Sequence, residues 1–310
     1  MGYIEKALKK ALAERQELNG RTAAERSDLA PISRGTYLPP EEITYTTTRC
    51  VPVEVATLQH NRILAGGANP LIAESYRHLR TKVLQKTAAE HRNVLMITSP
   101  IPNEGKSLTT INQAISIAQE LTQTVLLVDA DLRAPALTKY FGLSEESGLL
   151  DYLEGKKAVP ELLVHPQGLD RLVLLPAGQP TEWATELIRS PRMQGLVPEV
   201  KHHYPDRYVL FDLPPLLSYA DALAFAPMVD GIIVVVEARR TPREDLAKCK
   251  EALASHPVLG YVFNKAEHVS TKRYYQRYYQ RYGQGGKGHG GQGGFWRRLF
   301  GFGLTNGNKS

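Results

Sequence analysis

Short apolar runs alternate with segments of helical length between residues 71 and 260. The runs are nearly continuous in Val, Ile and Leu and do not alternate with polar residues, which is typical of parallel strands that helices cover on both faces. The six runs are "VLMITS", "TVLLVDAD", "RLVLLPAG", "YVLFDLPP", "GIIVVVEA" and "VLGYVFNK". We therefore predict an α/β domain over residues 70–270, with a mostly parallel sheet and helices on both of its faces.

The segments on either side of this domain have a different composition. Residues 1–18 repeat apolar positions at helical spacing, which predicts an amphipathic helix that docks on a partner or packs on its own domain. Residues 19–69 are rich in Pro, Thr, Arg and Gly without a sustained period, which predicts a flexible linker. After the domain, a flexible tail begins with a tyrosine-rich stretch over residues 271–284. Residues 285–310 follow as a Gly-rich spacer that ends in "FWRRLFGFG", a candidate membrane-surface segment.

Composition and charge narrow the setting of the protein. The chain has 310 residues and two cysteines, Cys50 and Cys249, without metal-ligand or disulfide spacing, which favours a reducing compartment. The N-terminus lacks the apolar core of a signal peptide, and the longest apolar run is too short to span a bilayer. The formal net charge is +6, but the residues from Thr271 onward carry eight Lys or Arg and no Asp or Glu. The basic character therefore belongs to the tail.

The stretch "SPIPNEGKSLTT", residues 99–110, joins a predicted strand to a predicted helix. This is the context of a phosphate-binding loop, in which Gly105 allows close backbone approach, Lys106 reaches the phosphates and Ser107 is placed to bind Mg²⁺. Pro100 stands where the usual first glycine would be, so the chain has to enter the loop without a positive φ at that position. We expect a nucleotide site at the start of the helix.

Carboxylates follow two further strands. Asp129, Asp131 and Arg133 end "VLLVDADLR", and Asp212 lies near the end of "YVLFDLPP". The carboxyl ends of parallel strands border the crevice where open α/β sheets bind ligands, so we expect Asp212 to hold Mg²⁺ through water beside Ser107. Either aspartate motif alone fits a solvated turn, whereas the three motifs in this order favour a nucleoside triphosphate site.

Together these motifs resemble those of the bacterial tyrosine kinases that regulate capsular and exopolysaccharide synthesis. The resemblance rests on "PNEGKS", "VLLVDADLR", "FDLPP", "YFGLSEESGLLDYLEG" and the tyrosine-rich end, and it covers residues 69–282. It implies the fold of P-loop ATPases and an ATP-dependent protein-tyrosine autokinase that uses Mg²⁺. The chain departs from the family pattern at Pro100, where the family has Ala, Gly or Ser, and at Asn103, where many members have Gly.

The resemblance also implies roles for particular residues. For the nucleotide they are Asn103, Glu104, Gly105, Lys106, Ser107, Leu108, Arg133 and Asn264, the last at the position where related ATPases contact adenine. For the metal they are Ser107, Asp129 and Asp212. The catalytic set is Lys106, Asp129 and Asp131, in which one of the two aspartates accepts the proton of the attacking tyrosine. The sequence leaves open which aspartate does so.

The tyrosine cluster "YYQRYYQRY" by itself is open to two interpretations. Its rings and arginines suit the stacking of nucleic-acid bases or a membrane surface, and its hydroxyls suit phosphate acceptors. The resemblance favours acceptors that one subunit presents to the crevice of another, and with it no nucleic-acid partner is expected. The acceptors are then Tyr274, Tyr275, Tyr278, Tyr279 and Tyr282.

Assembly and partners are implied in the same way. Glu74, Arg77 and Arg80 in "AESYRHLR" match an ExxRxxR pattern with which family members close a ring-like homo-oligomer such as an octamer, and the plain alternative is a solvated helix face. The resemblance further implies a cytoplasmic protein that a membrane co-polymerase, which sets polysaccharide chain length, holds at the inner face of the plasma membrane. Reversal of the phosphorylation requires a tyrosine phosphatase.

Two other functions remain open at the level of sequence. A partition or division-site ATPase of the same superfamily shares the three motifs, but it carries a signature lysine where this chain has Ile101 and it lacks a tyrosine cluster. The second is a nucleotide-binding regulator whose turnover is weakened by Pro100. Phosphotyrosine formation in the presence of ATP and Mg²⁺ separates both from an autokinase.

Overall fold

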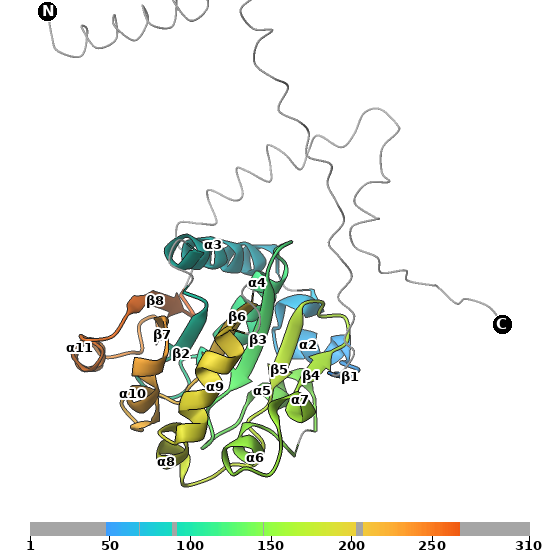
Figure 1. The fold of residues 1–310 in the computed structure, drawn as a ribbon. Helices are drawn as coiled ribbons and strands as arrows, with labels where there is room; N and C mark the ends of the chain where they lie inside the picture. The colour runs from blue at the N-terminus through green and yellow to red at the C-terminus, as the bar shows by residue number, and fades with distance from the viewer. Residues whose placement is uncertain (1–47, 68, 89–91, 145, 203–206, 267–310) are drawn as a thin grey trace, which may run out of the picture.

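The computed structural model describes residues 48–67, 69–88, 92–144, 146–202 and 207–266 of the chain. Eight strands form one sheet in the order β1-β4-β5-β3-β6-β2-β7-β8 (Figure 1). The predicted N-terminal helix, the tyrosine cluster and the aromatic and basic end lie outside the described residues. Across the described ranges, no helix is both long enough and apolar enough to cross a membrane.

Six of these strands are the six apolar runs of the sequence. They are β2 (Val94–Thr98), β3 (Thr124–Asp129), β5 (Leu172–Leu175), β6 (Arg207–Asp212), β7 (Gly231–Glu237) and β8 (Val258–Asn264). Each pairs in parallel with its neighbours among the six. The predicted α/β fold with a mostly parallel sheet is therefore confirmed.

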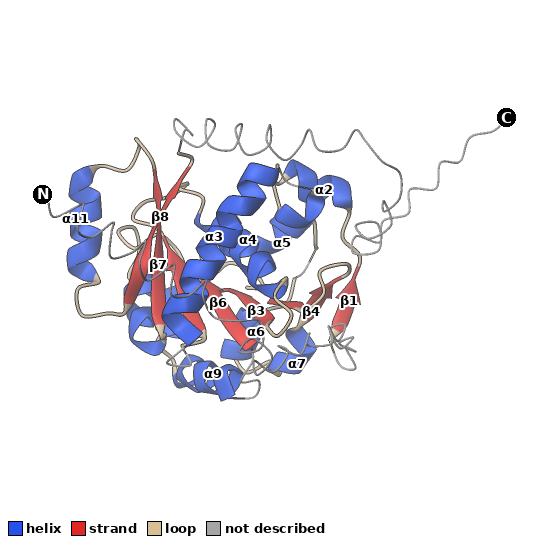
Figure 2. Ribbon diagram, turned by 90° about the horizontal axis from the view of Figure 1, so that it is seen from above, coloured by secondary structure: helices blue, strands red, loops and turns tan. Residues whose placement is uncertain are grey.

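Helices cover both faces of the sheet (Figure 2). Along β2, Val94 and Met96 enter one hydrophobic cluster while Leu95 and Ile97 enter another, because successive side chains of a strand point to opposite sides. The first cluster is completed by α6 (Leu149–Leu153), α7 (Val159–Leu162), α8 (Ala184–Ile188), α9 (Pro191–His202), α10 (Asp221–Phe225), η4 (Ala226–Met228) and α11 (Arg243–Ala252). The second is completed by α2 (Val55–His60), η2 (Leu64–Gly66), α3 (Pro70–Thr87), α4 (Lys106–Ala118) and α5 (Leu137–Phe141). Two buried faces explain why all of these strands except β8, which is partly exposed at the edge of the sheet, have continuous apolar sequences.

Residues 49–66, predicted as part of the linker, instead belong to the folded domain. β1 (Arg49–Val51) pairs in parallel with β4 (Val164–Pro166), which runs antiparallel to β5. Leu58 and Ile63 are buried in the second cluster. The linker prediction is wrong for this part because three-residue strands and a six-residue helix are too short to show a period. Their stability comes from tertiary contacts rather than from local propensity.

The order of the sheet brings three strand ends together. β6 lies between β2 and β3, and Asp129 at the end of β3 lies opposite Asp212 at the end of β6. The loop that leads from β2 to α4 starts beside them. The phosphate-loop motif and both aspartate motifs therefore meet at one edge of the sheet, as expected for a ligand crevice.

Candidate functional site

The loop between β2 and α4 makes its sharp turns at Asn103 and Gly105, which have φ values of 66° and 87°. Asparagine tolerates this left-handed region better than most residues, and glycine does so freely. A Cβ at Gly105 would lie 2.2 Å from Nδ2 of Asn264, so any other residue there would displace this amide. Pro100 does not have a positive φ, and the loop therefore forms without a glycine at its entrance.

Two carbonyl groups of the loop are held by residues at the end of β8. Nζ of Lys265 donates to the carbonyl oxygen of Asn103 at 2.9 Å, and Nδ2 of Asn264 donates to the carbonyl oxygen of Glu104 at 2.9 Å. Because the C=O and N–H of a trans peptide point in opposite directions, these bonds aim the amides of Glu104 and Gly105 at the other side of the loop. Amides exposed at the start of a helix form a phosphate site.

The side chain of Glu104 is buried behind the loop. Its Oε2 accepts a hydrogen bond from the amide of Ile101 at 3.0 Å, and its Oε1 accepts from the amide of Glu237 at 3.2 Å and from the hydroxyl of Thr241. Glu104 thus ties the loop to the end of β7. Only its backbone, not its carboxylate, is placed for the nucleotide contact that the sequence predicts.

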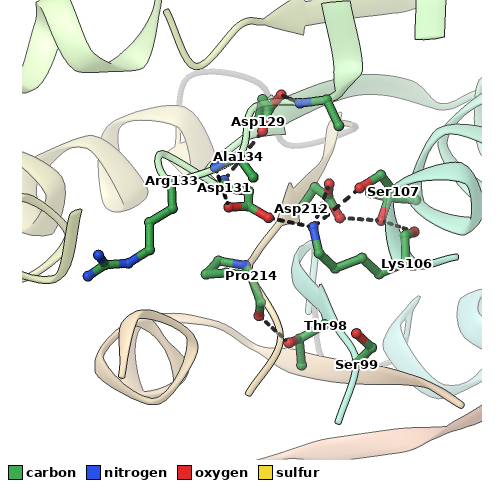
Figure 3. Close-up of polar contacts among 12 residues, drawn as sticks. Thr98, Ser99, Lys106, Ser107, Asp129, Asp131, Arg133, Ala134, Asp212 and Pro214 are labelled. Carbon is green, nitrogen blue, oxygen red and sulfur yellow. Dashed lines mark hydrogen bonds and ion pairs between the residues drawn. The ribbon is translucent and has the colours of Figure 1, made fainter. Parts of the chain in front are cut away.

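Lys106 points along the sheet edge toward the aspartates (Figure 3). Its Nζ lies 2.7 Å from Oδ2 of Asp131, 3.4 Å from Oδ2 of Asp212 and 3.3 Å from Oγ of Ser107. Burial lowers the pKa of Lys106, but the charges of Asp212 and Asp131 outweigh burial and raise the pKa above its usual value. The structure therefore brings four of the predicted site residues into direct contact.

Asp129 and Asp212 are fully buried beneath this lysine. Oδ2 of Asp129 accepts hydrogen bonds from the amides of Ala136 at 3.0 Å and Leu137 at 2.9 Å, which fixes the loop that leads into α5. Burial, with the charge of Asp212 as the next cause, raises the pKa of Asp129 to about 7. Burial also raises the pKa of Asp212. This end of the sheet therefore holds excess negative charge that a cation would relieve.

The residues present fit a magnesium ion that is bound partly by protein oxygens and partly by phosphate oxygens. Oδ1 of Asp212 accepts a hydrogen bond from Oγ1 of Thr110 at 3.1 Å, while its Oδ2 and Oγ of Ser107 both contact Lys106. In the described part of the chain, no three His, Cys, Asp or Glu residues come together as a metal site. Mg²⁺ commonly takes one or two protein oxygens and completes its shell with water and phosphate oxygens, so this donor set is sufficient.

Two predicted nucleotide contacts point elsewhere. The guanidinium of Arg133 turns away from Lys106 (Figure 3) and pairs with Asp221 through Nε and Oδ2 at 2.7 Å. The side chain of Leu108 packs against the second hydrophobic cluster. Neither side chain reaches the phosphate side of the loop in this structure.

The three predicted ring residues differ in their surroundings on α3. Glu74 pairs with Arg77 and lies 3.6 Å from the ring of His78, on an exposed part of the helix. Arg80 turns inward, where its Nε lies 2.8 Å from Oε1 of Glu120 and its NH1 donates to the carbonyl oxygen of Ser116 at 2.8 Å. Glu74 and Arg77 remain available to a neighbouring molecule, whereas Arg80 is engaged within its own chain.

Sequence reasoning missed Thr110, Thr241 and Lys265. Thr110 lies one helical turn after Lys106, so its spacing in "GKSLTT" could have placed it on the same side of α4. Lys265 and Thr241 carry no such signal, because they come to the loop from β8 and from the segment after β7.

The chain is similar to known proteins, although no family model matches it. The tyrosine-protein kinase YwqD of Bacillus subtilis is 36% identical over 222 residues, which are 70% of this chain and 92% of that protein. The succinoglycan biosynthesis transport protein ExoP of Rhizobium meliloti is 34% identical over 220 residues, which are 69% of this chain and 27% of that protein. The solved kinase domain of the Escherichia coli tyrosine kinase ETK is similar with a TM-score of 0.58 at 29% identity, over 63% of this chain and 77% of that one. The chain thus spans most of YwqD and about a quarter of ExoP.

Proposed function

The chain belongs to the bacterial tyrosine kinases of capsule and exopolysaccharide biosynthesis. We propose that it transfers the γ-phosphate of ATP to tyrosine residues of another copy of the same chain. The observation that carries the proposal is the position of Lys106, at the first residue of α4 and between Asp131 and Asp212. A triphosphate bound by the loop amides would lie beside this cation. The adjacent carboxylates supply metal ligands and a proton acceptor.

The transfer itself needs mainly positioning and charge neutralisation. When ATP binds, Lys106 exchanges its bonds with Asp131 and Asp212 for bonds with phosphate oxygens. Ser107 and Asp212 would hold a Mg²⁺ ion, which would further neutralise the phosphate charge. The tyrosine oxygen bonds to the γ-phosphorus as the bond from that phosphorus to the bridging oxygen of ADP breaks, and the tyrosine proton passes to a carboxylate.

Asp131 is the carboxylate that we assign as the proton acceptor. Its Oδ2 contacts Lys106 directly, so it becomes free when the lysine turns to the phosphates. Asp129 is less suited, because its Oδ2 accepts two amide hydrogen bonds and its Oδ1 accepts one from the amide of Asp131 at 3.3 Å. We assign Asp129 to holding Asp131 and the following loop in place.

The acceptors in this proposal are the five tyrosines of residues 274–282, which one subunit presents to another. Each phosphate adds about −1.5 to −2 charges at neutral pH, so a few phosphates reverse the charge of the basic tail. Subunits meet in a ring through Glu74 and Arg77 on the exposed part of α3. Accumulated negative charge would repel the tail from the aspartate-lined crevice and loosen the ring, and a tyrosine phosphatase would restore it.

A membrane partner completes the proposal. ExoP is named as a transport protein, and most of its length lies outside the part that matches this chain. We propose that a separate membrane co-polymerase takes that place here, recruits the kinase to the inner face of the plasma membrane and is regulated by it during polysaccharide polymerisation or export.

The test is incubation of the purified chain with ATP and Mg²⁺, followed by detection of phosphotyrosine. The parent chain should become phosphorylated, and the Lys106→Met variant should not, because methionine keeps the length of the side chain and removes the cation. ATP hydrolysis without phosphotyrosine would identify a nucleotide-dependent switch instead.

A further inference from the structure

A rigid surface lies next to the site, where the loops after β5, β3 and β6 meet. These strands are neighbours in the sheet, and Arg133 from the loop after β3 joins the other two loops. Its NH2 donates to Oδ1 of Asp221 at 3.2 Å and to Oγ1 of Thr185 at 3.0 Å, in addition to the ion pair through Nε. Asp221 is only 1% exposed. A two-pronged pair with a buried carboxylate holds all three loops in one arrangement.

Two large aromatic side chains are exposed around this arginine. Trp183 is 69% exposed and Tyr219 is 44% exposed. The Arg133 guanidinium lies 4.7 Å from the centre of the Tyr219 ring, and its NH1 donates to the carbonyl oxygen of Glu182, the residue before Trp183, at 3.4 Å. Exposed rings on a rigid surface are typical of sites that bind another chain, because they offer large contact area at little entropic cost.

The same surface is acidic. Glu182 and Glu186 are exposed on either side of Trp183 and Thr185, and Glu186 acts on Arg133 through its charge. The positive charge of Arg133 is already compensated by Asp221. The surface formed by Glu182, Trp183, Glu186 and Tyr219, which we call the acidic aromatic platform, therefore suits a partner that is basic and aromatic.

We infer that the acidic aromatic platform is the docking site for residues 271–282 of a second copy of this chain, an inference that rests on the proposed function. That segment reads "TKRYYQRYYQRY", with four Lys or Arg, five Tyr and no acidic residue. Its arginines match the two glutamates and stack on the exposed rings. The backbone of Arg133 is two residues from Asp131, which contacts Lys106, so a segment docked on the platform has only a short distance to extend before one of its tyrosines reaches the reacting groups.

The repeat in the segment gives the docking a further property. "RYYQ" occurs twice from Arg273 and is followed by "RY", so a shift of the segment by four residues presents the same side chains to the platform. One docking site can therefore serve tyrosines four residues apart, such as Tyr274, Tyr278 and Tyr282. No separate site is needed for each acceptor.

Geometry favours the segment of a neighbour over a chain's own segment. The described chain leaves the sheet at β8, which is five strand positions from β5. That separation is about 24 Å at the usual strand spacing. The eight Cα-to-Cα steps from Ala266 to Tyr274 span roughly 28 Å when fully extended. To place Tyr274 at the far side of the platform, a chain's own segment would have to be almost fully extended, whereas a neighbour's segment has no such constraint.

The experiment mixes two full-length chains. The donor has its five acceptor tyrosines changed to phenylalanine, and the acceptor carries Lys106→Met with its tyrosines intact. Donors with Glu182→Lys and Glu186→Lys together, or with Trp183→Ala, should raise KM for the acceptor chain about tenfold relative to the parent donor. The matched control is Glu251→Lys, an exposed acidic residue on α11, which should leave KM unchanged.

The most specific test reverses the charges of the acceptor segment and of the platform together. An acceptor in which Arg273, Arg277 and Arg281 are changed to Glu should be a poor substrate for the parent donor and should regain a low KM with the Glu182→Lys, Glu186→Lys donor. Equal KM values for parent and platform donors, or no rescue, would overturn the docking inference while phosphate transfer by the parent pair leaves the proposed function standing.

The same experiments distinguish failure of the proposed function from failure of the docking inference. No phosphotyrosine on the wild-type chain itself would mean that the proposed function fails. Phosphorylation of the wild-type chain, but not of the Lys106→Met chain in the mixture, would show transfer within one chain and overturn the docking of a second copy. A platform variant whose assembly mass by light scattering falls below that of a chain shortened to residues 1–270 would show that this face joins folded domains directly, which also overturns it.

Discussion

Asn264 and Gly105 provide a quantitative test of how the phosphate loop is held. Gly105→Ala places a side chain on a residue with a φ of 87°, which costs roughly 1–2 kcal/mol. The new Cβ would also lie 2.2 Å from Nδ2 of Asn264 and displace it from the carbonyl oxygen of Glu104. A lost hydrogen bond to a carbonyl group that is left without a partner costs about 1–3 kcal/mol.

The prediction is that the two substitutions are not additive. Asn264→Ala alone should lower the free energy of unfolding by about 1.5 kcal/mol, because it removes the same hydrogen bond. In the Gly105→Ala background that bond is already broken, so adding Asn264→Ala should cost close to nothing. The coupling energy of the double-mutant cycle is then about 1.5 kcal/mol.

Urea unfolding of the four proteins without nucleotide measures this coupling. Additive effects, within about 0.5 kcal/mol, would refute the reasoning that Asn264 acts through the loop. Nucleotide binding gives an independent reading. If Asn264 holds the loop, Asn264→Ala weakens ATP and GTP binding by the same factor. A loss confined to ATP would instead support the adenine contact that the family resemblance implies.

Four further outcomes are expected. Asp129→Asn should reduce autophosphorylation to the level of Lys106→Met, measured by phosphotyrosine detection, because it removes a charge beside Asp131; wild-type phosphorylation would show that Asp129 has no part in the site. Arg77→Glu should shift the dephosphorylated assembly toward monomer in light scattering, since Glu74 of a neighbour would then face a like charge, and an unchanged mass would exclude this contact. Arg80→Glu should instead lower the melting temperature of the isolated chain by a few degrees, because the new carboxylate faces Glu120. The pKa of Asp129 is about 7 in the folded protein against a usual value of 3.8, so between these pH values the folded state binds more protons than the unfolded state. The free energy of unfolding of the metal-free protein should therefore fall as pH rises through this range. Chemical unfolding at several pH values should show that the free energy of unfolding depends less on pH in Asp129→Asn than in the parent chain. The same pH dependence in both proteins would contradict the raised pKa of Asp129.

Five of the six strands that could be predicted from the sequence, all except the edge strand β8, are buried on both faces. Their runs of Val, Ile and Leu are a local record of two covering layers of helices, as in β2 and β7. β1 and β4 escaped prediction because each has three residues and lies toward the edge of the sheet, where pairing depends on residues far away in the sequence. The same holds for α2, which is held by burial of Leu58.

The sequence predicted those residues of the candidate site whose place depends only on the position of the backbone. Lys106, Asp131 and Asp212 each stand at the end of a strand or the start of a helix, and the parallel sheet brings those ends together. Side-chain direction was not predictable. Arg133 is two residues from Asp131 but pairs with Asp221, and Arg80 shares the helix of Arg77 but turns to Glu120. Such choices depend on partners that only the tertiary structure supplies.

The central claim is that the chain phosphorylates the tyrosine cluster of a second copy. The most direct measurement is mass spectrometry of a Lys106→Met chain after incubation with ATP, Mg²⁺ and an active chain whose five tyrosines at positions 274, 275, 278, 279 and 282 are phenylalanine. The Lys106→Met chain cannot phosphorylate itself, and the active chain carries no acceptor in its cluster. We predict phosphate on residues 274–282 of the Lys106→Met chain. Absence of phosphate there, with phosphotyrosine formed normally by the wild-type chain, would contradict the claim.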